Sequence, residues 1–196
     1  WPIEEIISVT QAAKENGLSA HMDGARLMNA VVESGTAATE YGRYFDSLWL
    51  DLSKGLGCPI GGVLAGSADF IEKAWRFKQQ IGGAMRQAGI VAAAGIYALE
   101  NHVDRLAVDH ENARAFSREI AQIPGIKLIF DHCPTNLVFF DVSETGMDAA
   151  TVAEKLLAHD VRIGAMGPYR MRAVTHLDIN WEQLSEAAEA LRKVVA

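Results

Sequence analysis

The sequence has few cysteines, an excess of acidic over basic residues and no long apolar run, and each of these narrows the possible classes of protein. Its 196 residues include two cysteines, Cys58 and Cys133, with no CxxC or His-rich spacing, so neither a disulfide framework nor a zinc site is indicated. The 18 lysines and arginines are outnumbered by 25 acidic residues and form no basic block, which argues against nucleic acid or an anionic membrane as a partner. No apolar stretch reaches the roughly 18–20 residues of a membrane span. We therefore expect reduced thiols and a cytoplasmic protein.

The first part of the chain alternates between helical and strand patterns with short connections. Helical periodicity is followed by an apolar run, and the order then repeats. The predicted helices cover 3–17, 27–34, 37–44 and 67–80, and the predicted strands cover 18–22, 45–50 and 61–65. Such alternation is typical of an α/β sheet with parallel neighbouring strands and flanking helices.

The rhythm of the sequence changes in the second part. Residues 85–121 contain no proline and predict one long helix, which ends before Pro124 and Gly125. Shorter elements follow: strands at 126–130, 136–142, 161–163 and 170–175, and helices at 149–159 and 181–195. We predict two domains, a mostly parallel α/β domain over 1–122 that includes a bridging helix, and a small α+β domain over 123–196.

A lysine and an aspartate each follow a predicted buried strand. Lys54 comes just after the run 45–50, and Asp23 follows the preceding strand, 31 positions earlier. That separation is the length of one strand–helix–strand crossover, so both side chains should reach the carboxyl edge of the sheet, where open α/β sheets bind ligands. They are either a simple ion pair or the two groups that pyridoxal phosphate requires, an amine for its aldehyde and a carboxylate for its pyridine nitrogen. Arg26 is near enough in sequence to share the pocket.

Four short segments carry a specific resemblance. They are HMDGARL at 21–27, SKGLG at 53–57 followed by Pro59 and Gly61, GGAMRQ at 82–87, and RAVTHLD at 172–178. In this order and spacing the chain resembles the low-specificity L-threonine aldolases, which belong to the β-eliminating lyase/threonine aldolase group of fold-type-I pyridoxal phosphate enzymes. The similarity runs over essentially the whole chain.

The resemblance implies a role for each matching residue. Lys54 is the lysine that joins the cofactor as a Schiff base, and Asp23 pairs with the pyridine nitrogen. Arg26 lies near the ring hydroxyl and the substrate carboxylate, Arg172 grips the substrate carboxylate, and Arg86 lies near a subunit boundary. The implied reaction is a retro-aldol cleavage of L-threonine, L-allo-threonine or a related β-hydroxy-α-amino acid to glycine and an aldehyde.

The resemblance also implies partners. Members of this family are nearly twice as long as this chain, and their additional part supplies the phosphate loop and the histidine that stacks on the cofactor ring. We expect that part on another chain or in a longer precursor, and we expect a homodimer or homotetramer. Two alternatives stay open: a β-eliminating lyase that releases pyruvate and ammonia, and an inactive fragment that needs its N-terminal half.

Overall fold

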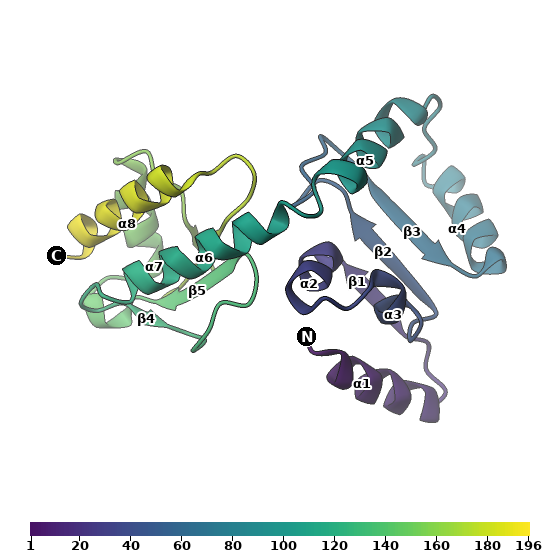
Figure 1. Cartoon of the computed structure of the whole chain (residues 1–196), viewed down its shortest axis with the longest axis horizontal. Coiled ribbons are helices and arrows are strands. Elements are labelled where there is room, and N and C mark those ends of the chain that lie inside the picture. Colours follow the sequence, from purple (N-terminus) through teal and green to yellow (C-terminus); the bar gives the residue numbers. More distant parts are fainter. The chain divides into compact units, whose positions relative to one another are not determined.

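The computed structural model describes all 196 residues, which divide into two compact units, Trp1–Leu106 and Ala107–Ala196. In the first unit, helices and strands alternate as the sequence pattern predicts (Figure 1). The elements of this unit are α1 (Ile3–Glu15), β1 (His21–Gly24), α2 (Leu27–Ser34), α3 (Ala38–Gly42), β2 (Ser47–Asp51), β3 (Gly62–Gly66), α4 (Ala68–Gln80) and α5 (Gly89–Asn101).

The sheet of the first unit has three strands in the order β1-β2-β3. Strands β1 and β2 are parallel, with Asp23 opposite Trp49, which confirms the parallel pair expected from the crossover spacing. Strand β3 runs antiparallel to β2. Only residues 52–61 connect these two strands, and a parallel connection needs about a dozen residues or more. The outer edges of β1 and β3 have no partner strand within the chain.

Alternation along the strands gives the two faces of this sheet different characters. Helices α1 to α3 cover one face, where a cluster around Ile6, Leu27 and Tyr41 packs with Met22 and Leu50. The side chains that alternate with these, including Asp23, Trp49 and Asp51, therefore project from the opposite face. Trp49 and Asp51 are thus separated by the sheet from this apolar cluster.

The single long helix predicted over 85–121 is wrong, because the chain breaks at residues 102–105 into α5 and α6 (Leu106–Ile120). His102 ends α5 and its ring Nδ1 lies 2.6 Å from the carbonyl oxygen of Leu56, a tertiary contact with no local sequence signal. We placed the domain boundary after residue 122, whereas the two units meet at the start of α6. Phe116 and Ile120 of that helix belong to the core of the second unit.

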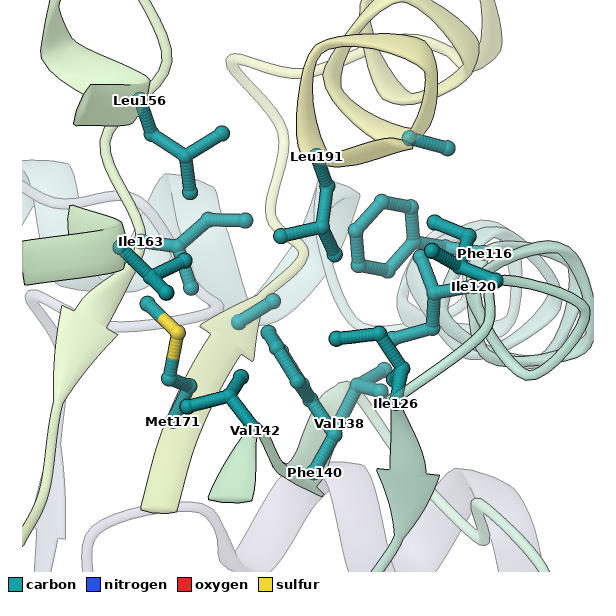
Figure 2. Close-up of a cluster of buried hydrophobic side chains, with 14 of the residues drawn as sticks. Phe116, Ile120, Ile126, Val138, Phe140, Val142, Leu156, Ile163, Met171 and Leu191 are labelled. Atoms are coloured by element: carbon teal, nitrogen blue, oxygen red, sulfur yellow. The ribbon is translucent and has the colours of Figure 1, made fainter. Parts of the chain in front are cut away.

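The second unit is an α+β structure, as expected. Its remaining elements are β4 (Lys127–Leu128), β5 (Leu137–Asp141), η1 (Ser143–Thr145), α7 (Ala149–Leu157), β6 (Gly164–Ala165), β7 (Arg170–Val174) and α8 (Trp181–Val195). The strands form an antiparallel sheet in the order β4-β5-β7-β6. Figure 2 shows how Phe116, Ile120 and Leu191 from the helices meet Val138 and Met171 from the sheet. None of the helices combines the length and hydrophobicity that a membrane crossing requires.

Candidate active site

The lysine lies in a loop that the backbone closes tightly. Cys58 donates its N–H to the carbonyl of Leu52 at 2.9 Å, and Leu52 donates to Gly61 at 3.0 Å. Within the loop, Gly57 donates to the carbonyl of Lys54 at 2.9 Å and has a φ of 73°, a conformation that glycine adopts without steric cost. The loop therefore carries Lys54 from β2 in a defined conformation.

Helix α5 anchors this loop from one side. Leu52, Leu56 and Cys58 form a buried cluster with Ala98. The Cys58 thiol donates to the carbonyl of Ala94 at 3.4 Å, and burial, together with the charge of Asp51, raises the pKa of that thiol. The position of Cys58 is that of a buried packing residue rather than of a reactive thiol.

The amine of Lys54 has two partners on the same face of the sheet. Its Nζ lies 2.9 Å from Oδ2 of Asp51, and it sits 5.2 Å from the centre of the Trp49 ring. The first distance is within the range of an ion pair, and the second is within the range of a cation–π contact. The Lys54 side chain keeps 36% of its surface exposed, so a small molecule can reach the amine.

Asp51 is held by its own turn. Its Oδ1 accepts hydrogen bonds from the backbone N–H of Ser53 at 2.7 Å and from the Ser53 hydroxyl at 2.6 Å. Burial alone would raise the pKa of the Asp51 carboxyl, but the hydrogen bonds from Ser53 and the charge of Lys54 outweigh burial and hold that pKa below its ordinary value. Asp51 is therefore an anion next to the lysine.

Asp23 is the penultimate residue of the neighbouring strand and is opposite Trp49. Its Oδ1 accepts the N–H of Ala25 at 3.1 Å, and the side chain is exposed. The next residue, Gly24, is buried so closely against β2 that a Cβ there would lie 2.3 Å from the carbonyl oxygen of Trp49. Because neighbouring residues in register share a face of the sheet, the side chains of Asp23 and Trp49 project from the same face.

Asp23 and Arg26 both line a hollow of about 550 Å³ along the open edge of β1. Arg26 is the N-cap residue of α2, three positions after Asp23. The walls are mainly apolar and include Ile6 and Val9 of α1. The structure thus brings Asp23 and Arg26 to one hollow, whereas Lys54 does not line it and lies in the loop that follows the adjacent strand.

Arg172 belongs to the second unit, in the middle of β7. It is opposite Phe139 of β5 and Gly164 of β6. Its neighbours Met171 and Ala173 are buried in the core, so Arg172 projects from the other face and is half-buried. His176 lies 3.5 Å from Asp178, and neither has a hydrogen bond to Arg172.

Sequence reasoning missed three residues that shape the lysine's surroundings: Asp51, Trp49 and His102. Asp51 had only a weak signal, its position just after the predicted strand 45–50. Trp49 could have been placed from the parallel register alone. His102 had no such signal, because its contact with Leu56 joins residues 46 positions apart.

Comparison with known proteins places these residues in a family. Residues 1–145 match the family model described as Beta-eliminating lyase. The chain is 42% identical over 195 residues to the low specificity L-threonine aldolase of Escherichia coli K12, covering all of this chain and 56% of the relative. It is 36% identical over 164 residues to the low specificity L-threonine aldolase of Saccharomyces cerevisiae, covering 83% of this chain and 42% of that protein.

Solved structures agree on the fold. A crystal structure of a putative L-allo-threonine aldolase from Listeria monocytogenes matches with a TM-score of 0.80 at 22% identity, over 99% of this chain and 57% of the other. The Leishmania major threonine aldolase matches with a TM-score of 0.75 at 19% identity, over 100% of this chain and 57% of that one. The chain thus spans about half the length of the relatives it matches. The resemblance seen in the four sequence segments is confirmed, and the chain belongs to the β-eliminating lyase family.

Proposed function

We propose that this chain provides the amine-bearing part of a pyridoxal phosphate-dependent aldolase. The substrate would be L-threonine, L-allo-threonine or a related β-hydroxy-α-amino acid, and the products glycine and an aldehyde. The observation that carries the proposal is that Asp23 lies on β1 and Lys54 in the loop after β2, and that these two strands are parallel neighbours. Two of the relatives described above are named low specificity L-threonine aldolases, which supports this substrate class.

The residues present fit pyridoxal phosphate in their chemistry. The cofactor needs a reachable primary amine, and Lys54 is partly exposed. It also needs an anion for its pyridine nitrogen, and Asp23 is an exposed carboxylate on the adjacent strand. When bound, the cofactor supplies an electron sink for the bond that breaks in the amino acid.

The remaining roles are assigned to side chains of this chain. Lys54 offers the amine that attaches the cofactor, and Asp23 keeps a proton on the pyridine nitrogen by its negative charge. Arg26, at the N-terminus of α2, and Arg172, on β7, are the arginines we assign to anionic groups of the ring and of the substrate carboxylate, because a guanidinium binds a carboxylate through two parallel N–H bonds.

We further propose that the active protein contains more than this chain and is a homodimer or homotetramer. The coverage of about half of each relative supports a missing portion. The open edges of β1 and β3 are places where further strands fit, and all five residues of β3 are exposed. Hereafter the complete protein means this chain together with that portion. Its compartment is proposed to be the cytoplasm, in keeping with two cysteines that remain thiols.

The test is a product assay on the complete protein with added pyridoxal phosphate. We expect glycine and acetaldehyde from L-threonine or L-allo-threonine, and visible absorbance from the bound cofactor. The Lys54→Ala variant should lose both signals. Retention of the bound-cofactor absorbance in Lys54→Ala would overturn the assignment.

The family description itself favours a second candidate, a β-eliminating lyase. That enzyme would release pyruvate and ammonia from an amino acid with a leaving group on Cβ, so the same assay distinguishes it by its products. The inactive-fragment alternative is tested by supplying residues 1–196 alone. Under our proposal they bind no cofactor, and binding appears when the missing portion is added.

A further inference from the structure

Asp51 is an acidic residue to which the family resemblance gives no role. It is the last residue of β2 and only 9% exposed. Ser53 holds its Oδ1 with two hydrogen bonds, of 2.7 and 2.6 Å, and this leaves Oδ2 facing Lys54 at 2.9 Å. Because Oδ1 is fixed by these hydrogen bonds, the position of Oδ2 is fixed as well. The carboxylate is therefore preorganised to bind a cation at Oδ2.

The ring of Trp49 is the second group that contacts the Lys54 amine. Trp49 is two residues before Asp51 and therefore on the same face of the strand. A Cβ at Gly62, the partner of Asp51 on β3, would lie 3.3 Å from the Cε3 atom of Trp49, so the indole occupies the space that a side chain there would fill. The amine of Lys54 lies 5.2 Å from the centre of that ring.

We propose that Asp51 is a positioning residue for Lys54: whenever Nζ is not joined to a carbonyl carbon, Oδ2 receives it as an ammonium ion above the Trp49 ring. The inference rests on the proposed function of Lys54. It gives the lysine a defined place between turnovers. Without it, a four-carbon side chain that is partly exposed would sample many rotamers.

A second ion pair with the same spacing shows what is distinctive here. Arg43 and Glu40 lie 2.7 Å apart at (i, i+3), but their side chains are 58% and 49% exposed. Exposed pairs of this kind have little effect on either partner. The Asp51 side chain is 10% exposed and fixed by Ser53, so its field acts on Lys54 with less screening by water.

The consequence is chemical. The Lys54 amine is engaged with Oδ2 at 2.9 Å, and it must leave this contact before it can attack a carbonyl or an anhydride. Asp51 should therefore slow the acylation of Lys54. Replacing Asp51 by asparagine keeps the shape and removes the charge, so Lys54 should become more reactive.

The experiment is trace acetylation of the complete protein, stripped of cofactor, with acetic anhydride from pH 6 to 10. Peptide mass spectrometry then gives the labelling of Lys54 relative to Lys14, an exposed lysine on α1. We expect Asp51→Asn to raise this ratio about threefold or more at pH 7, as the loss of a partly screened ion pair predicts. Asp51→Glu should restore the low ratio, and the control Glu40→Gln should leave it unchanged.

Ser53→Ala provides a second variant that releases Oδ1 without removing the charge, and its ratio should rise less than that of Asp51→Asn. If Asp51→Asn fails to fold, the labelling ratio of Ser53→Ala alone tests the inference. An unchanged ratio in the folded variants, or an equal rise in Glu40→Gln, overturns the inference. The assay needs neither cofactor nor substrate, so its failure is distinguishable from failure of the proposed function, which the product assay reports.

Discussion

Asp23 of β1 and Trp49 of β2 lie side by side in the parallel register of the sheet, and the amine of Lys54 is 5.2 Å from the centre of that tryptophan ring. The parallel pairing thus sets the strand that carries Asp23 next to the strand that leads to Lys54, although the two residues are 31 positions apart in the sequence.

If Asp23 stabilises a protonated pyridine nitrogen, its charge is essential and its shape is not. Asp23→Asn should lower the cleavage rate of the complete protein by about 100-fold or more, the range seen when a preorganised electrostatic group is lost. Because Asp23 is exposed, the free energy of unfolding should change by less than about 0.5 kcal/mol. Steady-state rates and denaturant melts check this, with Asp69→Asn on α4 as the control for a lost charge. Full activity in Asp23→Asn would contradict the role.

Gly24 is required by the close approach of β1 to β2. A Cβ at this position would lie 2.3 Å from the backbone carbonyl oxygen of Trp49, so the strands must move apart in Gly24→Ala. We expect destabilisation of about 1–3 kcal/mol, as for overpacked cores. Gly89→Ala is a matched control, because nothing lies within 4 Å of its Cβ and it begins α5; its effect should be neutral or stabilising by up to about 1 kcal/mol. Equal free energies of unfolding for the two variants in urea melts would contradict the requirement for glycine at position 24.

His102 ties the lysine loop to the end of α5. Its Nδ1 must carry the proton in the bond to the Leu56 carbonyl, at 2.6 Å, and its ring meets Tyr97 edge-on. His102→Ala should cost about 1–2 kcal/mol of stability. It should also speed hydrogen exchange at the amides of Gly57 and Cys58, which close the loop. The control is His159→Ala, at an exposed histidine after α7. If hydrogen exchange at Gly57 and Cys58 is unchanged in His102→Ala, the conformation of the loop does not depend on His102.

The pKa of Asp51 predicts a pH dependence with a definite sign. Because the folded pKa lies below the ordinary value of 3.8, the charged form stabilises the fold above that value, and the stabilisation is lost as pH falls through the folded pKa. The difference in Tm between wild type and Asp51→Asn should therefore be constant above about pH 5 and shrink below pH 3.8. A difference that grows as the pH falls would have the wrong sign.

Local patterns were enough to predict the parallel pair. The apolar runs and the 31-residue crossover predict two neighbouring parallel strands, and the register confirms that pair. Asp23 lies within β1 rather than after it, and Lys54 lies in the loop after β2. The break between α5 and α6 could not be predicted in this way, since the 102–105 stretch has no proline or glycine and the helix ends where His102 contacts a distant loop. Strand β1 also begins later than expected, at His21, because pairing with Ser47 rather than hydrophobicity sets where it starts.

The contacts of Lys54 with Asp51 and Trp49 could not be predicted from the sequence, for a different reason. Asp51 was grouped with the loop after the strand, although it is the final residue of β2 and nearly buried. A single acidic residue beside a lysine in sequence usually indicates solvent. Only the turn at Ser53, which fixes one carboxylate oxygen, shows that this one is positioned.

The measurement that tests the central claim most directly is borohydride reduction of the complete protein loaded with pyridoxal phosphate, followed by peptide mapping. Reduction makes the link between the cofactor and its lysine permanent, so the modified residue is identified by mass. The account predicts one modified site per chain, Lys54, in the peptide that continues into Gly55 and Leu56. A modified peptide containing Lys78, Lys127 or any other lysine, with Lys54 unmodified, would contradict it.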